Sequence, residues 1–171
     1  TLAMFPNIKR RSLGFPMTAF IEAHIEQGPI LEELGVPVGV VTGIQGSRRF
    51  RVRVTGDEGH AGTLPMSDRK DALFSALEMI GAMRQAFDTD QVKFTTGLFQ
   101  VSPNVPSVVP SNVLFSIDIR HPDGQTLKRL GNAISGLCEE NRGPCAVEVM
   151  EIATSDSLEF PNEIRACISN S

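Results

Sequence analysis

Two of the three histidines in this chain lie in surroundings that could support chemistry. His24 lies between Glu22 and Glu26 in the segment AFIEAHIEQ, whose strict alternation predicts a strand with these three side chains on one face. An imidazole between two carboxylates can ligate a metal ion or become more basic, although a solvated histidine fits the same pattern. His60 lies in the loop GDEGHAGTLPM, where it could donate to a developing oxyanion or be an ordinary surface histidine.

Two other polar side chains could contact a ligand. Arg120 ends a predicted strand in the segment SIDIRHPD, and an arginine there can hold a carboxylate through two parallel hydrogen bonds. An ion pair with Asp118 or Asp123 is the alternative role for this guanidinium. Ser107 lies in PNVPSVVPSN, a stiff proline-rich loop that could present it to a ligand or serve only as a connection.

Length and composition exclude several functional classes. The chain has 171 residues, of which 41% are hydrophobic, and a formal net charge of -4, which suits one globular domain, alone or with parts of another. A mildly acidic chain without a basic cluster is not expected to bind nucleic acid or an anionic membrane surface, and no apolar run reaches the ~18 residues of a membrane span. The cysteines form no CxxC pair, which predicts reduced thiols in a cytoplasmic protein rather than disulfides or a zinc–thiolate site.

Periodicity predicts the elements that must position these side chains. Alternation and β-branched residues predict strands over residues 19–27, 37–56, 92–102, 112–120 and 145–153. A short helix over residues 30–34 should end at Gly35, where a glycine can take the left-handed cap conformation. Longer amphipathic helices should run from a Ser67 cap to about Phe87, and onward from a turn at residues 122–124.

From residue 37 to residue 153 the predicted order is β-α-β-β-α-β. Each helix has one apolar stripe and each strand one apolar face, which predicts an α+β fold of the ferredoxin-like type: a four-stranded antiparallel sheet with two helices on one face. Residues 1–34 and 155–171 lie outside this unit, as they would if one domain were inserted into another. The strand over residues 92–102 is the candidate sheet edge for pairing with a second copy of the chain.

Five motifs, in one order along the chain, resemble those of a known family. They are HIEQGP (24–29), GVVTGIQGSRRF (39–50), GHAGTLPM (59–66), RKDAL (69–73) and DIRHPD (118–123). Together they closely resemble the M20-type metal-dependent amidohydrolases related to N-carbamoyl-L-amino acid hydrolase, allantoate amidohydrolase and β-ureidopropionase. The resemblance extends over about residues 17–155, which is most of the chain.

The resemblance implies a role for each candidate residue. His24 matches a histidine that ligates one of two divalent metal ions, Zn or Mn, and Gln27 matches a glutamine that touches substrate near them. His60 matches a histidine that enters the active site of the other subunit of a homodimer and holds the oxyanion. Arg120 matches the arginine that grips the carboxylate of a small-molecule substrate. Ser107 stands where the family has asparagine, so it keeps a donor but has a shorter reach.

The resemblance also implies that this chain is part of a longer enzyme, since the general-base glutamate and the other metal ligands of the family lie outside it. Residues 35–154 correspond to the dimerisation (lid) domain, and residues 1–34 and 155–171 to flanks from the catalytic domain. We expect the parent to hydrolyse a linear ureido or amide C–N bond, with N-carbamoyl-L-amino acids as first candidates and allantoate or ureidopropionate next. We expect the fragment alone to bind no metal and to be inactive; a non-catalytic self-association module is the alternative.

Overall fold

The computed structural model describes residue 14 and residues 16–170, so the predicted flank of residues 1–34 is covered only in part. The chain divides into two compact units. The larger unit is Thr42–Phe160, and the second combines the two ends of the chain, up to Val41 and from Pro161. Every strand of the described part belongs to the larger unit, which is therefore the sheet-bearing part of the chain.

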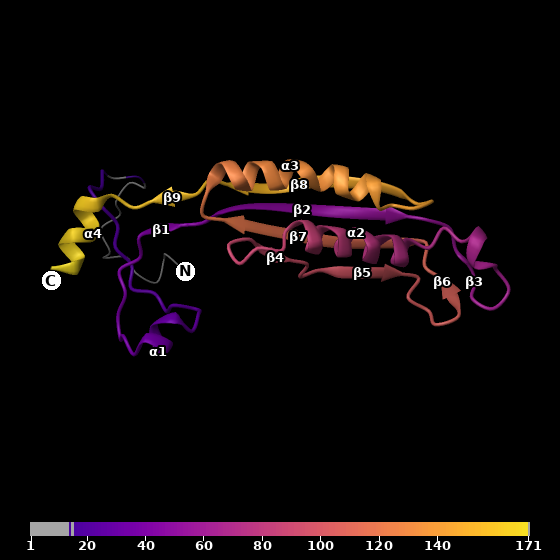
Figure 1. Cartoon of the computed structure of the whole chain (residues 1–171), viewed down its shortest axis with the longest axis horizontal. Helices are drawn as coiled ribbons and strands as arrows, with labels where there is room; N and C mark the ends of the chain where they lie inside the picture. The colour runs from indigo at the N-terminus through magenta and orange to yellow at the C-terminus, as the bar shows by residue number, and fades with distance from the viewer. Residues whose placement is uncertain (1–13, 15, 171) are drawn as a thin grey trace, which may run out of the picture. The chain divides into compact units, whose positions relative to one another are not determined.

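One antiparallel sheet of five strands forms the larger unit (Figure 1). Its central path, in spatial order, is β4 (Lys93–Thr95), β7 (Asn112–His121), β2 (Gly46–Thr55) and β8 (Ala146–Ser155), and β5 (Phe99–Ser102) also pairs with β7. β2 and β7 are paired over their full lengths, from Gly46 opposite His121 to Thr55 opposite Asn112. Short ladders follow at each end of β2: β1 (Gly43–Ile44) with β9 (Leu158–Glu159), and β3 (Gly59–His60) with β6 (Val108–Val109).

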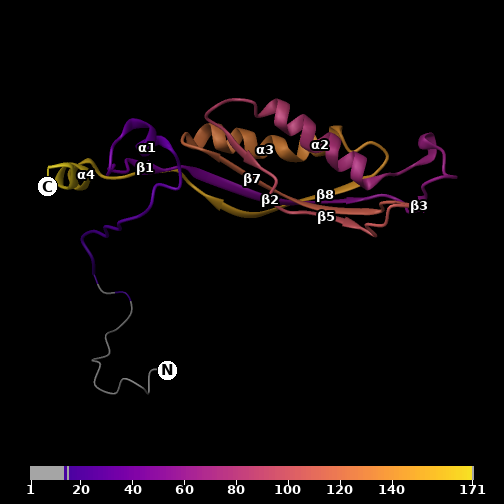
Figure 2. The ribbon, with the colours of Figure 1, turned by 90° about the horizontal axis from the view of Figure 1, so that it is seen from below.

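Helices α2 (Ala72–Ala86) and α3 (Gly124–Glu140) cover the same face of this sheet (Figure 2). Each follows an aspartate whose carboxylate accepts first-turn backbone N–H groups, Asp71 for α2 and Asp123 for α3. The core between helices and sheet is formed by inward-facing apolar side chains, among them Phe50, Val52, Val54, Met79, Met83, Phe115, Ile117, Ile119 and Ile134. The arginines that alternate with the β2 members of this core lie on the open face, as the alternation predicts.

The predicted α+β class and the antiparallel pairing are confirmed, but the sheet has five strands rather than four. Residues 92–102 form two strands because the ladder to β7 is interrupted between Thr95, opposite Asp118, and Phe99, opposite Phe115. One extra residue is accommodated there, as in a β-bulge. The hydroxyl of Ser116 accepts a hydrogen bond of 2.9 Å from the Leu98 N–H at the interruption. β4 and β5 still occupy the expected edge of the sheet.

The start of the first long helix differs from the prediction. Ser67 does not cap it; Met66–Asp68 form a short 3-10 helix, η2, and Arg69 then takes an extended conformation. Asp71 caps α2 instead, because the chain re-enters helical geometry only after it. None of the helices in the described part of the chain is long and apolar enough to cross a membrane.

The second unit contains α1 (Ile30–Leu34) and α4 (Asn162–Ser169). α1 ends at Gly35 in the left-handed conformation, with φ of 65°, as expected. The predicted strand over residues 19–27 is wrong: these residues are exposed and form no ladder within the described chain. Alternation alone does not make a strand when no partner satisfies its backbone groups. The Glu26 carboxylate instead accepts the first N–H groups of α1, at 3.0 Å from each of two backbone nitrogens.

Candidate functional site

His60 lies in a loop that extends beyond Thr55, the last residue of β2. It forms part of the β3–β6 ladder, where it lies opposite Val108 (Figure 1). The backbone N–H of the next residue, Ala61, donates to the Ser107 carbonyl over 3.0 Å. These contacts place His60 and Ser107, two residues predicted separately from different loops, beside each other at one end of the sheet. Both side chains are exposed.

The His60 ring is oriented by its own loop. The Gly62 N–H donates to His60 Nδ1 over 3.1 Å. In a neutral imidazole one nitrogen accepts and the other donates, so this bond assigns the proton to Nε2. A side chain at position 62 would crowd the ring, since a Cβ there would lie 3.3 Å from His60 Cε1. The arrangement therefore presents an exposed, neutral N–H donor, which is the group needed to stabilise a negative oxygen.

Arg69, which the sequence patterns did not mark as a candidate, also contacts this loop. Arg69 donates from Nη2 to the Ala61 carbonyl at 2.7 Å and from Nε to the Leu64 carbonyl at 3.1 Å. Both carbonyls belong to the segment that follows His60. The available sequence signal was its position as the first residue of the RKDAL motif, directly after the loop, but no periodicity marks it as a contact.

Arg120 lies at the other end of β7, on the face of the sheet that the helices leave open. Its Nε and Nη2 donate to the two oxygens of Asp118, each at 3.0 Å, and Arg49 donates to the same carboxylate at 3.0 Å. The ion pair that the sequence left as an alternative is therefore present. Asp118 occupies the edge of the guanidinium formed by Nε and Nη2, so the Nη1 donors take no part in this ion pair.

The charges in this cluster reinforce one another. The hydrogen bond from Arg120, followed by the attraction of Arg120 and Arg49, lowers the pKa of Asp118 despite its partial burial. The same hydrogen bond raises the pKa of Arg120. Asp118 is thus ionised at neutral pH and holds Arg120 in a fixed direction. The cluster keeps a net positive charge that suits a carboxylate.

His60 and Arg120 cannot reach one small molecule from the same chain. Thr55, which precedes the His60 loop, pairs with Asn112 at one end of β7, and Arg120 pairs with Ser47 near the other end. The eight residue-to-residue steps from Asn112 to Arg120 span about 26 Å in an extended strand. Within one chain, a small molecule in contact with His60 is therefore out of reach of Arg120.

His24 and Gln27 belong to the second unit and lie in its exposed, irregular segment. His24 Nδ1 is 2.6 Å from the Ile25 carbonyl oxygen, and Gln27 has a positive φ of 56°. The predicted strand face shared by His24 and two glutamates is not formed, because Glu26 caps α1. Among residues 14 and 16–170, no three His, Cys, Asp or Glu side chains come together as a metal site.

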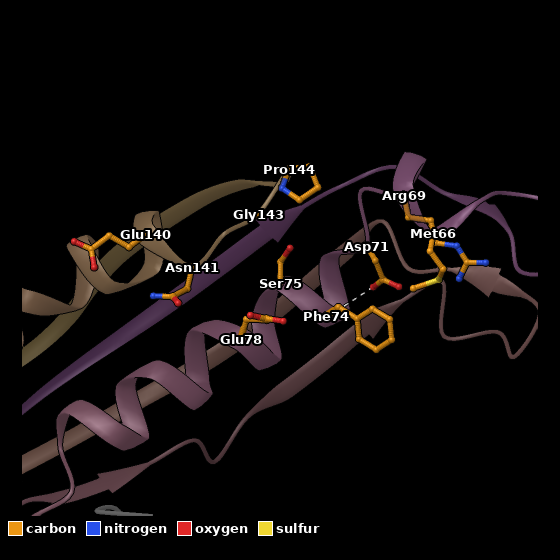
Figure 3. A pocket seen from close by; sticks show the side chains of 10 residues that line it. All are labelled: Met66, Arg69, Asp71, Phe74, Ser75, Glu78, Glu140, Asn141, Gly143 and Pro144. Atoms are coloured by element: carbon orange, nitrogen blue, oxygen red, sulfur yellow. Dashed lines mark hydrogen bonds between the residues drawn. The ribbon is translucent and has the colours of Figure 1, made fainter.

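Two depressions on the larger unit do not contain the predicted site residues. One, of about 340 Å³, lies between the start of α2 and the turn after α3 and is lined by Arg69, Asp71, Glu78 and Glu140, among others (Figure 3). The other, of about 140 Å³, lies on the open face of the sheet beside Arg51 and Met150. The candidate donors lie instead at the two ends of the sheet.

Comparisons with known proteins agree with these motifs. Residues 42–144 match the peptidase dimerisation domain family of the M20 type. The chain is 40% identical over 128 residues to the allantoate amidohydrolase of Bacillus subtilis (strain 168), covering 71% of this chain and 31% of that protein. It is 42% identical over 126 residues to the N-carbamoyl-L-amino-acid amidohydrolase of Paenarthrobacter aurescens, covering 72% and 31%.

A solved structure extends the similarity to the fold. The hydantoinase/carbamoylase family amidase from Burkholderia vietnamiensis matches with a TM-score of 0.77 and 33% identity, covering 86% of this chain and 37% of that one. The chain spans about a third of the length of the curated relatives it matches. The predicted resemblance to M20-type amidohydrolases is confirmed, and the chain belongs to the peptidase dimerisation domain family of that group.

Proposed function

We propose that this chain supplies the dimerisation domain and flanking segments of an amidohydrolase that cleaves a ureido or amide C–N bond, with N-carbamoyl-L-amino acids as the first substrate class. The observation that supports this most is the placement of two suitable donors, His60 and Arg120, at opposite ends of one sheet. A neutral N–H suits a developing oxyanion, and a cationic fork suits a carboxylate. Allantoate is the second candidate, favoured by the similarity to the allantoate amidohydrolase of Bacillus subtilis; ureidopropionate is the third.

In this proposal His60 acts on the reacting carbonyl of the substrate bound by the partner subunit. Its Nε2–H donates to the carbonyl oxygen and holds it more tightly as negative charge develops on the tetrahedral intermediate. The proton stays on Nε2 because Gly62 occupies Nδ1. Ser107, beside it, offers a second and shorter donor to the same substrate. One such donor typically contributes a factor of roughly 10²–10³ to the rate.

Arg120 binds the substrate carboxylate within its own subunit and so fixes the orientation of the scissile bond. Gln27, from the second unit, is proposed as a further substrate contact. Since about 26 Å of β7 separate Arg120 from Asn112, which pairs with Thr55 before the His60 loop, a complete site combines the Arg120 end of one chain with the His60 end of its partner. Two identical sites then form in a homodimer with two-fold symmetry.

The parent enzyme is proposed to hold two divalent metal ions, Zn or Mn. The described residues of this chain do not by themselves fit such a centre, because His24 is a single imidazole and no group of three ligands surrounds it. A catalytic metal ion needs about three protein ligands, so the remaining ligands would come from the parent outside this segment. We expect the isolated chain to bind neither ion and to have no turnover.

The proposed homodimer forms through the free edge of β4 and β5. Phe99 on this edge is 39% exposed, and Phe74 and Leu77, one turn apart on α2, are 52% and 50% exposed. The ring of Phe87, at the end of α2, packs on Phe94 of β4 at 5.6 Å, so this helix lies over the same side of the sheet. Pairing two such edges would cover all three exposed side chains. Sedimentation as a monomer at micromolar concentration would contradict this part of the proposal.

The domain organisation follows from the same proposal. Residues 35–154 act as the dimerisation domain, and residues 1–34 and 155–171 return the chain to a catalytic domain. We also propose that the βαββαβ unit is ferredoxin-like, with its second strand divided into β4 and β5. Its order β8-β2-β7-β4 and its antiparallel pairing support this assignment.

We place the parent enzyme in the cytoplasm. Two of its thiols, Cys138 and Cys145, are buried and carry no disulfide. Burial raises the pKa of Cys138 to about 12, so this thiol remains protonated and inert. Such apolar, reduced thiols suit a reducing compartment.

A mixed-subunit experiment tests the shared site. His60→Ala and Arg120→Ala subunits of the full-length enzyme, each nearly inactive alone, are co-expressed and assayed for ammonia release from an N-carbamoyl-L-amino acid and from allantoate. If each site uses His60 of one chain and Arg120 of the other, half of the dimers regain one intact site, which gives about a quarter of wild-type activity in a symmetric dimer. Activity no higher than that of the separate variants would contradict the proposal.

A further inference from the structure

We propose that Arg69 is a positioning residue that holds the His60 loop in the conformation that presents Nε2–H. Its effect on turnover rests on the proposed function of His60, whereas its role in holding the loop rests only on the contacts described here. Arg69 touches no candidate substrate group itself. It acts through the backbone of the residues that follow His60.

The contacts of Arg69 span the loop. Its guanidinium bonds the carbonyls of Ala61 and Leu64, on either side of Gly62, which in turn bonds the His60 ring. The side chain is half-buried, and Figure 3 shows it with Met66 and Asp71 where the chain enters α2. A planar fork with several donors can bridge two carbonyls in a way that a single ammonium cannot.

Apart from the bonds to Arg69, the His60 loop makes few contacts with the rest of the larger unit. Residues 60–63 are exposed, and the β3–β6 ladder is only two residues long on each side. Within the loop, the His60 carbonyl accepts from Leu64 N–H at 3.1 Å and, less closely, from Thr63 N–H at 3.4 Å. Segments with few buried contacts open at a small free-energy cost. Together with the Ala61 N–H bond to the Ser107 carbonyl, the two bonds from Arg69 are therefore a large share of what holds this segment.

The backbone on which Arg69 sits is, by contrast, fixed to the sheet. The Lys70 carbonyl accepts from Asp57 N–H at 2.9 Å, and Ala72 N–H donates to the Pro110 carbonyl at 3.1 Å. The approach is so close that a Cβ on Gly56 would lie 1.8 Å from the Lys70 oxygen. Arg69 thus connects a rigid anchor to a weakly held loop, which is how a supporting residue keeps a functional group in place.

The loop-holding role is tested on the 171-residue chain by amide hydrogen exchange. In Arg69→Ala we expect the amides of Ala61, Gly62 and Leu64 to exchange at least about tenfold faster, because the loop opens more often. Arg142→Ala is the matched control: Arg142 also holds a backbone carbonyl, that of Cys145 at 2.7 Å, but at the turn after α3. It should leave the three loop amides unchanged. Unchanged exchange in Arg69→Ala would overturn the inference.

The catalytic consequence is tested in the full-length enzyme by a double-mutant cycle, with an N-carbamoyl-L-amino acid and with allantoate as substrates. Arg69→Ala should lower kcat about tenfold with little change in KM, since a displaced donor weakens transition-state stabilisation. In a His60→Ala background the same change should have no further effect on kcat. Additive losses would show that Arg69 acts independently of His60 and would overturn the inference.

Further measurements distinguish a general loss of stability from failure of the proposed role of His60 and from failure of the proposed role of Arg69. Exchange of the core Phe115 amide reports global stability, and Arg69→Lys, which retains one donor group, should give loop exchange between wild type and Arg69→Ala. If His60→Ala leaves kcat unchanged, the proposed function of His60 fails while the exchange result still decides the loop-holding role. If His60→Ala lowers kcat but no Arg69 variant alters loop exchange, only the present inference fails.

Discussion

The candidate donors at the two ends of the β2–β7 pair, His60 and Arg120, are held in different ways. At one end His60 lies in an exposed loop, where its ring accepts a hydrogen bond from the Gly62 N–H and Arg69 bonds the Ala61 carbonyl. At the other end Arg120 lies on the strand itself and is oriented by the carboxylate of Asp118. The loop donor is therefore held through hydrogen bonds from a residue directly after its loop, whereas the strand donor is positioned by the pleat and one neighbour.

The two ends also differ in how the chain enters them. Gly46 begins β2 and Gly56 follows its end, and both are approached closely by backbone. At Gly56 an added Cβ would meet the Lys70 carbonyl oxygen at 1.8 Å, whereas at Gly46 it would meet Ser157 N at 2.9 Å and a Leu127 methyl at 2.7 Å. At the His60 end, the backbone at Gly56 is therefore more tightly packed than the backbone at Gly46, whereas the loop that carries His60 is held by fewer contacts.

The largest effect on activity is expected at the His60 end. In the full-length enzyme, His60→Ala should lower kcat by roughly 10²–10³ with a small change in KM, because the lost hydrogen bond is strongest in the transition state. His60→Gln, which retains an N–H donor, should recover part of this loss. Ser67→Ala, in the neighbouring η2 turn, is the control and should behave as wild type. A loss expressed only in KM would contradict the role of oxyanion donor.

Substitution of Gly56 and Gly46 measures how closely other atoms pack against the backbone at the two ends of β2. Gly56→Ala should destabilise the chain by about 3 kcal/mol or more, because the clash is with a fixed carbonyl, and Gly46→Ala by about 1–3 kcal/mol. Gly81→Ala, in α2 with open space around it, should stabilise by about 0.5–1 kcal/mol. Urea unfolding of the three variants gives the comparison. A smaller loss for Gly56→Ala than for Gly46→Ala would contradict it.

At the Arg120 end the expected effect is on binding. Arg120→Lys should raise KM about 10- to 100-fold, since an ammonium cannot make two parallel bonds to a carboxylate. Arg51→Lys, on the same open face, is the matched control and should leave KM unchanged. A substrate analogue with a carboxamide in place of the carboxylate should bind wild type and Arg120→Lys equally well. If the analogue still distinguishes them, Arg120 does not contact that carboxylate.

The smallest effect concerns Asp118 and pH. Arg120 lowers the pKa of Asp118 in the folded chain, so the pair stabilises the fold above the unfolded pKa of about 3.9 and loses this contribution as pH falls below it. Asp118→Asn should therefore cost about 0.2–1 kcal/mol at pH 7 and less at pH 3. Urea midpoints at the two pH values measure this, with Asp88→Asn, an exposed residue after α2, as control. A difference that grows on acidification would contradict the assignment.

Local pattern was sufficient for the elements whose partners follow from it. The alternation in β2 and β7 places one apolar face under the helices, the two long helices follow their predicted apolar stripes, and α1 ends at the predicted Gly35 cap. Local pattern was insufficient where a contact with a residue distant in the sequence accompanies the end of a strand or the start of a helix. The Ser116 hydroxyl accepts the Leu98 N–H where the edge strand is interrupted. The contact between Ala72 and the Pro110 carbonyl accompanies a helix start at Asp71 rather than Ser67.

For the candidate site, the sequence by itself determined which residue types are available: an imidazole among glycines, an arginine at a strand end, and motifs specific enough to identify the family. The residue types can be read from the sequence because they depend only on local neighbours, and the family can be recognised because its motifs follow one order along the chain. Only the tertiary structure decided that His60 and Ser107 are neighbours, that Arg69 supports their loop, and that Arg120 lies at the far end of the sheet. Strand register and backbone hydrogen bonds between distant segments set these distances, and no spacing along the chain encodes them.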